Sequence, residues 1–181
     1  MTRIIFSSII NDLKTAAEVP THPFRYFTLA TSDIHGSPRM RTVVLRDIDE
    51  KLNLMVYTDS RSKKVTQISE YNSVSLLFLD TERLLQISIL AKAEIITNDK
   101  TLQSIWKGIS PKSRKDYTSQ QSPGKKINDP TSIDYLKGKH FFSAIKLIPS
   151  HIEYLRLKEP DHLRVEFKRE SSEWNSSYLA P

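Results

Sequence analysis

Residues 50–64, EKLNLMVYTDSRSKK, contain the pattern that decides the fold class of this chain. Leucine or valine occupies every second position from Leu52 to Val56, and the residues between them are polar, long or aromatic. This period of two predicts a strand with one buried face over residues 50–59. The serines and the helical spacing of apolar residues that follow predict a helix over residues 60–71.

The rest of the chain repeats short β-prone stretches separated by turn residues, without regular alternation of strands and helices. We therefore predict a single domain over residues 1–181 that is mainly β, an antiparallel barrel with peripheral helices. Residues 119–131 are rich in turn formers, which predicts a mobile loop. Further strands are predicted at residues 24–33, 38–48, 73–80, 83–97, 141–149, 151–157, 163–169 and 173–180, with an amphipathic helix before Pro20 and another helix over residues 99–117.

The composition limits the kinds of site that this chain can hold. There is no cysteine among the 181 residues, which excludes disulfides, thiol catalysis and cysteine-ligated metal. The five histidines show no metal-ligand spacing. No apolar run approaches the roughly 18 residues of a membrane span. We therefore expect a cytoplasmic protein without a metal site and without a membrane partner.

The net charge of +6 suits either a solvated basic surface or an anionic partner. The basic residues are scattered over strands and loops and show no recognition helix, so no nucleic-acid partner is expected. A phosphorylated small molecule remains. Because the four glycines form neither a G-x-G-x-x-G nor a P-loop, its phosphate would be held by arginine, lysine and serine side chains.

Three cations, Arg61, Lys63 and Lys64, lie at the expected start of the helix over residues 60–71. Cations in a first helical turn are each unfavourable by about 0.3–1 kcal/mol, because this end carries the positive pole of the helix dipole. Free backbone N–H groups at the same end attract anions. The pattern therefore predicts either a phosphate site or an exposed basic turn.

Arg41 shares a strand face with Val43 and Leu45, where an unpaired charge would be costly. One interpretation is a salt bridge to an acidic residue of the following stretch 47–50. The other is a bidentate clamp on a phosphate, which would relieve the same cost.

Gln86 lies on the strand face opposite Leu85 and Ile87. A glutamine has two donors and an acceptor, so it could read the edge of a planar heterocycle. The alternative is a glutamine on the solvated face of the sheet.

Several stretches then carry a resemblance when they are taken in order. They are PRMRTVVLRDID (38–49), LNLMVYTDSRSKK (52–64), LLQISILAKAEI (84–95) and the ending that starts with IEYLRLKEPDHLRVEF (152–167). Together they resemble the pyridoxamine 5′-phosphate oxidase family of FMN-binding split barrels. The segment SIWKGISPKSRKDYTSQQSPG (104–124) is more similar to the oxidase-related FMN-binding branch than to the vitamin-B6 oxidases.

The resemblance implies a split β-barrel that binds FMN without a covalent bond, in a homodimer with FMN at the subunit interface. Lys63 and Lys64 match the Arg-Lys phosphate pair of the family, so one of the two is a lysine in place of an arginine, which keeps the charge and loses the bidentate geometry. The residues that match FMN-binding positions of the family are Arg41, Thr42, Val43, Val44, Tyr57, Thr58, Ser62, Lys63, Lys64, Gln86, Gln121, Ser122 and Arg164.

The substrate positions depart further from the family pattern. Arg46 stands where a lysine is expected, Trp106 replaces a tyrosine and Arg114 a serine. His162 matches the family histidine, whereas Leu155 stands where a tryptophan packs on the flavin. The resemblance implies an FMN-dependent oxidoreductase that passes hydride from an amine or alcohol to flavin N5, with reoxidation by oxygen. The alternatives are a non-catalytic flavin-binding protein and a flavin reductase-like activity on another substrate.

Overall fold

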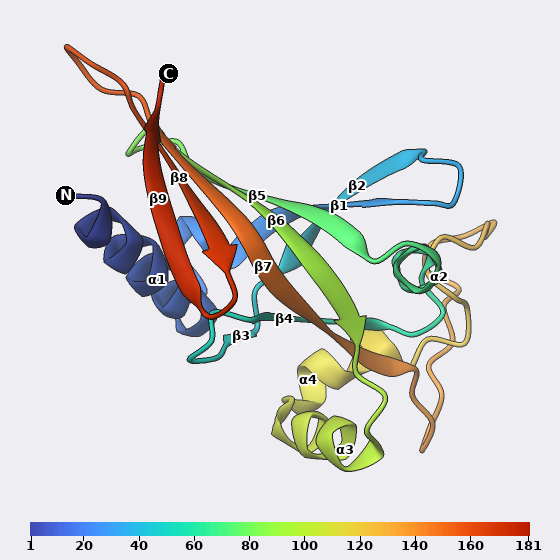
Figure 1. Ribbon diagram of the computed structural model, residues 1–181. Helices are drawn as coiled ribbons and strands as arrows, with labels where there is room; N and C mark the ends of the chain where they lie inside the picture. The colour runs from blue at the N-terminus through green and yellow to red at the C-terminus, as the bar shows by residue number, and fades with distance from the viewer.

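Antiparallel pairing joins all the strands of the molecule into one strongly bent sheet, as Figure 1 shows for the computed structural model of residues 1–181. The sheet order is β2-β1-β5-β6-β7-β4-β3, and β8 adds to β7 and carries β9. The predicted mainly β, antiparallel architecture with peripheral helices is confirmed. The strands are β1 (Tyr26–Ser32), β2 (Pro38–Val44), β3 (Asp47–Ile48), β4 (Leu54–Asp59), β5 (Ser73–Asp80), β6 (Leu85–Ile95), β7 (Phe142–Arg156), β8 (Leu163–Glu170) and β9 (Glu173–Leu179).

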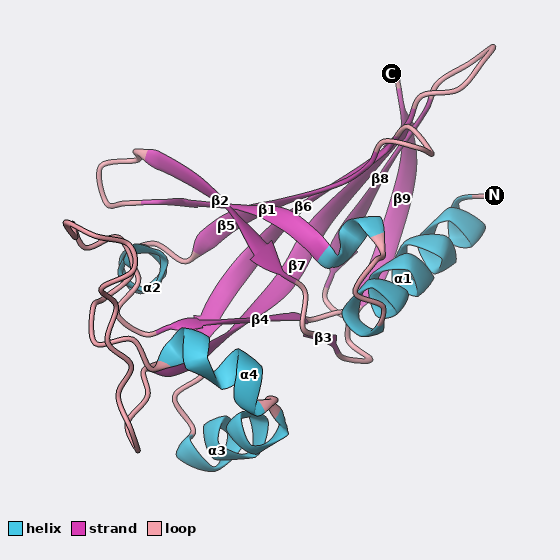
Figure 2. Ribbon diagram, turned by 180° about the vertical axis from the view of Figure 1, so that it is seen from behind, coloured by secondary structure: helices cyan, strands magenta, loops and turns pink.

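The helices lie at the rims of the sheet and not between strands (Figure 2). None of them is both long and apolar enough to span a bilayer. They are α1 (Thr2–Glu18), α2 (Lys63–Glu70), α3 (Asp99–Gly108) and α4 (Pro111–Arg114), with single 3₁₀ turns η1 (Pro23–Arg25) and η2 (Lys115–Tyr117).

β7 is one long strand where the sequence predicts two, over residues 141–149 and 151–157. Its pairing with β6 continues through a bulge, because Ala91 pairs with Pro149 and Leu90 with His151, which leaves Ser150 without a partner residue. The extra residue reverses the alternation of buried side chains. In the sequence, such a reversal looks like the end of one strand and the start of another, which is why two strands are predicted. The first half of β7 also pairs with β4 and the second half with β8.

Two other predicted elements are interrupted in the structure. The strand predicted over residues 38–48 leaves β1 after Val44, and the next backbone hydrogen bond to a strand runs from Arg46 N to the Met55 carbonyl of β4. The helix predicted over residues 99–117 ends at Gly108, and Ser110 caps a new helical turn that starts with Pro111. Proline favours the first position of a helix and disfavours a helical conformation of the residue before it.

The core fills the concave side of the sheet, and α1 closes one end of it. Ile5, Ile9, Leu13 and Ala16 of α1 recur at helical spacing and are buried, as the sequence predicts. A smaller apolar cluster around Phe142 lies on the other side of β4 and β7 and holds α3 and η2. The sheet therefore offers separate environments on its two faces.

Candidate anion and cofactor site

The side chain of Arg41 points to the concave side of the sheet, where Leu29, its partner residue on β1, is fully buried. Its guanidinium donates to the Leu29 carbonyl at 3.0 Å, to Thr31 Oγ1 at 2.7 Å and to Gln67 Oε1 at 3.2 Å. All three acceptors are neutral, and Arg41 forms no salt bridge. The interpretation of Arg41 as half of an internal ion pair is therefore wrong.

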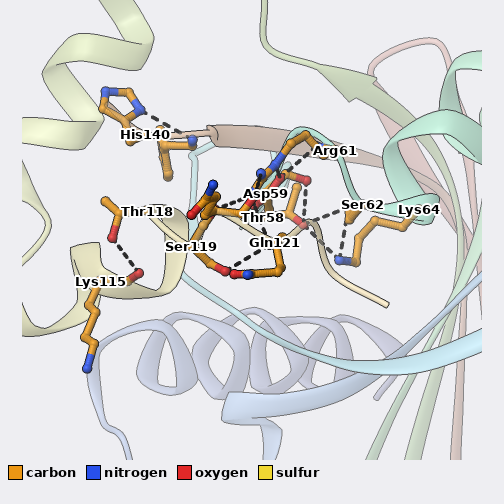
Figure 3. A network of polar contacts seen from close by, with 12 residues as sticks. Thr58, Asp59, Arg61, Ser62, Lys64, Lys115, Thr118, Ser119, Gln121 and His140 are labelled. Carbon is orange, nitrogen blue, oxygen red and sulfur yellow. Dashed lines mark hydrogen bonds and ion pairs between the residues drawn. The ribbon is translucent and has the colours of Figure 1, made fainter. Parts of the chain in front are cut away.

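Lys64 of α2 is the second cation of this region. Its ammonium donates to Thr58 Oγ1 at 2.8 Å and lies 3.4 Å from Ser62 Oγ, and these two hydroxyls are 3.2 Å apart (Figure 3). Burial, and then the charge of Arg41, lower the pKa of Lys64. Burial, followed by the charge of Arg39, likewise lowers the pKa of Arg41. The charge of Asp59 opposes this lowering for Lys64, but it is the smallest of the three effects. Two desolvated cations that repel one another, and whose hydrogen-bond partners are all neutral, form a site that an anion would stabilise.

We use the name anion pocket for a group of four side chains, Arg41, Thr58, Ser62 and Lys64. Ser62 is the N-cap residue of α2, but its hydroxyl turns to Thr58 and does not cap the helix. The first turn of α2 holds no acidic residue. The pocket thus offers two cations, two hydroxyls and a helix N-terminus, which are the donors that a phosphate group needs.

The structure separates the three cations that the sequence groups at this helix start. Lys64 turns inward to the anion pocket, whereas the neighbouring Lys63 is exposed. Arg61 forms a bidentate ion pair with Asp59, at 2.6 Å between Nη2 and Oδ2 and 3.0 Å between Nε and Oδ1. The interpretation of Arg61 as a free cation of a phosphate site is therefore wrong, because Asp59 neutralises it.

Thr31 and Gln67 belong to the same hydrogen-bond network and were not predicted. Thr31 Oγ1 donates to Gln67 Oε1 at 2.7 Å, and both side chains are buried beside Arg41. The sequence contains a signal for Thr31, because it continues the buried alternation of Phe27 and Leu29 with a polar residue. A polar residue at a buried strand position requires a partner.

A second group of predicted cofactor residues lies on the convex face of the sheet. Gln86 pairs with Leu155, and Leu155 pairs with Arg164, so the three side chains form a row across β6, β7 and β8. Their strand neighbours Ile87 and Val165 point into the core. Arg164 is paired with Glu153 at 2.9 Å, and its buried Nε has no hydrogen-bond partner.

The anion pocket and this row therefore lie on opposite faces of one sheet. Arg41 and Gln86 cannot contact one small ligand from the same side within a single chain. The remaining predicted strand residues divide in the same way, since Val43 is buried in the core and Thr42 is exposed on the convex face. Val44 is half-buried at the end of β2, which is an edge strand.

The predicted residues Gln121 and Ser122 lie in the loop between η2 and β7, next to the anion pocket. Arg61, one residue before Ser62, donates to the backbone carbonyls of Ser119, Gln120 and Gln121 (Figure 3). Gln121 Oε1 is buried and has no hydrogen-bond partner. Both predicted residues are thus within reach of this end of β4, while the mobility of residues 119–131 stays a prediction.

A pocket of about 440 Å³ opens between β4 and the α3–α4 segment. Arg46, Tyr57 and Tyr117 are among the residues that line it. Burial raises the pKa of both tyrosines, so their hydroxyls stay protonated donors at neutral pH. Ser104, Ser110 and Ser113 complete a polar wall. A pocket of this size and lining suits a small anionic molecule.

The other predicted substrate residues, Trp106, Arg114 and His162, do not line this pocket. The Trp106 ring stacks on His140 with 4.0 Å between centroids, and the Arg114 guanidinium lies 5.2 Å from the Trp106 ring. Arg114 also donates to the Lys107 carbonyl. His162 lies in the hairpin between β7 and β8, which projects from the end of the sheet opposite α2 (Figure 1). Within one chain, the structure does not bring His162 together with Arg46.

Comparison with known proteins identifies the family of this chain. Residues 6–97, half of the chain, match the model of the pyridoxamine 5′-phosphate oxidase, FMN-binding domain. A pyridoxine/pyridoxamine 5′-phosphate oxidase of Shewanella baltica is 29% identical over 167 residues, which cover 84% of this chain and 77% of the oxidase. The corresponding protein of a Shewanella species is 27% identical over 197 residues, which cover 91% of this chain and 92% of that protein.

Solved structures share the fold. A pyridoxamine 5′-phosphate oxidase-related, FMN-binding protein of Nostoc punctiforme superposes with a TM-score of 0.79 at 23% identity and covers 97% of this chain and 96% of its own. PhzG of Burkholderia lata, solved in complex with tetrahydrophenazine-1-carboxylic acid, gives a TM-score of 0.80 at 22% identity and covers 97% and 92%. With its mainly β antiparallel split-barrel fold, this chain belongs to the pyridoxamine 5′-phosphate oxidase-related family of FMN-binding domains.

Proposed function

We propose that this chain binds FMN and acts as an FMN-dependent oxidoreductase. The observation that carries the proposal is the anion pocket, in which Arg41 and Lys64 lie close enough to repel one another and have no acidic partner. The phosphate of FMN would neutralise both cations and accept from Thr58 and Ser62. These residues bind and orient; none of them is required to transfer a proton.

When bound, FMN would supply the redox chemistry, which in flavoproteins is hydride acceptance at N5 followed by reoxidation. The protein would supply position and electrostatics. Gln86, without a side-chain hydrogen bond of its own in the chain, is suited to the polar edge of the flavin ring. Arg164 would add a cation to the site once its guanidinium turns from Glu153 toward the ligand.

We also propose that the FMN site is completed by a homodimer. The anion pocket and the Gln86 row lie on opposite faces of the sheet, so a ligand that contacts both needs two chains. The convex face exposes Leu77, Leu79 and Leu90 beside Gln86, with 52% of Leu79 accessible. An apolar patch of this kind favours burial against a second copy.

The substrate of the proposed reaction is a small molecule with an acidic group, a phosphate or a carboxylate. The pocket beside Tyr57 supports this, since Arg46 lines it and no acidic residue does. Arg46 and the tyrosine hydroxyls would hold the acidic group.

A non-catalytic flavin-binding protein is the second candidate function. Two observations favour it. The Trp106 ring stacks on His140 and lies near the Arg114 guanidinium, and neither Trp106 nor Arg114, both at positions predicted for substrate, lines the 440 Å³ pocket. Leu155 also offers no aromatic ring to the flavin. Pyridoxine 5′-phosphate and pyridoxamine 5′-phosphate are therefore the first compounds to test as substrates, and the proposal does not depend on either of them.

Titration of FMN with the purified protein tests the first part of the proposal. Quenching of FMN fluorescence should give saturable binding, and riboflavin, which lacks the phosphate, should bind far more weakly. Arg41→Met should weaken FMN binding by about tenfold to a hundredfold, since it removes one charge-assisted phosphate contact. Equal affinities of wild type and Arg41→Met would exclude the anion pocket as the phosphate site.

Turnover separates the two candidate functions. The FMN-loaded protein is mixed with pyridoxamine 5′-phosphate, pyridoxine 5′-phosphate and a set of small carboxylated amines and alcohols, and oxygen consumption is followed. Oxygen uptake that depends on both substrate and FMN supports an oxidoreductase. FMN binding with no reduction by any compound supports the flavin-binding alternative.

A further inference from the structure

The Arg61 guanidinium joins three segments that are distant in the sequence. Its Nε and Nη2 bind the Asp59 carboxylate at the end of β4, and Asp59 is 5% exposed. Nη1 donates to the Gln120 carbonyl at 3.0 Å, and Nη2 to the Ser119 carbonyl at 2.8 Å. The Arg61 Cζ atom also lies 3.3 Å from the ring centre of Phe141, just before β7.

The three carbonyls of residues 119–121 form the base of a long loop. Close to this base, Ser119 forms an isolated bridge with Tyr135, and the Gln120 N–H donates to the Asp134 carbonyl at 2.8 Å. The stretch between these anchors, residues 123–132, is exposed throughout. Arg61 is thus the charged contact between this loop and the strand β4.

Asp59 and Arg61, which bind each other, lie between two residues of the anion pocket in the sequence. Thr58 of the pocket precedes Asp59, and Arg61 precedes Ser62, whose hydroxyl lies 3.2 Å from that of Thr58. Asp59 and Arg61 therefore lie in the same short stretch of backbone as the two pocket hydroxyls (Figure 3). The loop and the pocket share one turn of chain, residues 58–62.

Lysine could not replace arginine in this position. The guanidinium uses a planar set of donors toward one carboxylate and three carbonyls, whereas a lysine ammonium is a point charge with three donors. A purely electrostatic role toward a phosphate would tolerate lysine. The contacts of Arg61 therefore indicate a geometric role, which is separate from the charges of Arg41 and Lys64.

We propose that Arg61 is a positioning residue that couples the loop over residues 118–136 to the anion pocket. Fixing the loop base and binding a phosphorylated ligand then stabilise each other, and this coupling is reciprocal. The identity of the ligand as FMN rests on the proposed function. The contact between Arg61 and the loop does not.

The test combines FMN affinity with trypsin cleavage after Lys125 and Lys126 in the loop. In the wild type, FMN should slow this cleavage. Arg61→Lys should raise the cleavage rate in the absence of ligand, abolish the protection by FMN and raise the FMN dissociation constant by about tenfold, the effect of losing roughly one charged hydrogen-bond contribution. Asp59→Asn should act in the same direction, and the double variant should be little worse than either single variant.

Arg3→Lys is the matched control, because Arg3 is exposed on α1 and far from the loop in sequence and fold. It should leave cleavage and FMN affinity unchanged. Wild-type cleavage and affinity in Arg61→Lys would overturn the proposal. If the wild type does not bind FMN, the proposed function fails, and the cleavage rates without ligand still decide whether Arg61 holds the loop.

Discussion

At the scale of single residues, the distinctive feature of the anion pocket is that its two cations form no ion pair with an acidic residue. Five ion pairs of arginine or lysine form elsewhere in the chain, yet neither Arg41 nor Lys64 takes part in one. Both give up part of their hydration and face one another across neutral groups. This arrangement costs stability in the absence of a ligand, and an anion recovers the cost on binding.

The lowered pKa of Lys64 leads to a pH dependence of FMN binding. A phosphate favours the charged ammonium, so binding raises the pKa of Lys64 above its value in the free protein. Affinity should therefore be constant while Lys64 is protonated in the free protein, and should fall as pH rises through that lowered pKa. Fluorescence titrations between neutral and alkaline pH measure this.

Two variants make that pH dependence specific. Lys64→Met should bind FMN about tenfold more weakly at neutral pH and should lose the alkaline decline, because the titrating contact is gone. Lys63→Met, a change at the exposed neighbour, should keep the decline. A decline that persists in Lys64→Met would assign the titration to another group.

At the scale of elements, one polar turn connects the helix α1 to the sheet. Asp80 ends β5, is 5% exposed and accepts hydrogen bonds from the Arg83 guanidinium and from the Glu82 and Arg83 N–H groups. Arg83 also forms an ion pair with Asp12 of α1 at 2.9 Å. Burial disfavours the charged form of Asp80, but these hydrogen bonds outweigh it and lower the pKa of Asp80.

Asp80→Asn should lower the free energy of unfolding by about 1–3 kcal/mol at pH 7, the usual cost of losing hydrogen bonds to a charged group. The folded pKa lies below the unfolded value, so the contribution of Asp80 is present above the unfolded pKa of about 3.9 and is lost as pH falls through the folded pKa. Urea unfolding at pH 7 and pH 3 should show a smaller difference at pH 3.

Glu82→Gln in the same turn serves as the control, since only its backbone N–H contacts Asp80. It should unfold like the wild type at both pH values. A difference between Asp80→Asn and wild type that is as large at pH 3 as at pH 7 would show that charge on Asp80 does not stabilise the turn.

At the scale of the whole molecule, the division of the predicted cofactor residues between two faces leads to a complementation experiment. One chain carries Arg41→Met, and the other carries Gln86→Ala with Arg164→Met. Homodimers of either chain should bind FMN weakly. In a mixed dimer, one site combines two damaged faces and the other combines two intact faces.

Random mixing of the two chains should therefore restore tight FMN binding at about a quarter of the sites, because half of the dimers are mixed and one site in each is intact. The measurement is the FMN-to-protein ratio after co-expression and desalting. Sedimentation of each variant checks that it still dimerises. Recovery of no sites, with mixed dimers present, would contradict a site that spans two chains.

Much of the fold could be predicted from local patterns. The strand ahead of Asp59, the helix start at Ser62 and the apolar stripe of α1 each depend on residues close in sequence. Two of the predictions that were wrong depend on distant partners, whereas the helix break before Pro111 follows from a local signal. Ser150 continues β7 because β6 pairs with β7 on either side of the bulge. The chain leaves its pairing with β1 after Val44, and Arg46 bonds to β4 instead.

Local patterns and composition are enough to predict that this chain forms an antiparallel sheet, that it holds no cysteine or glycine-loop chemistry, and which residues match FMN-binding positions. They do not predict which cations remain without acidic partners, since Arg41, Lys64 and Arg61 look alike along the chain and only the folded molecule distinguishes them. Pairing depends on the face to which each side chain points and on what folds against it. In this chain, an acidic residue two positions away neutralises Arg61, whereas the two cations brought together from β2 and α2 have only neutral hydrogen-bond partners.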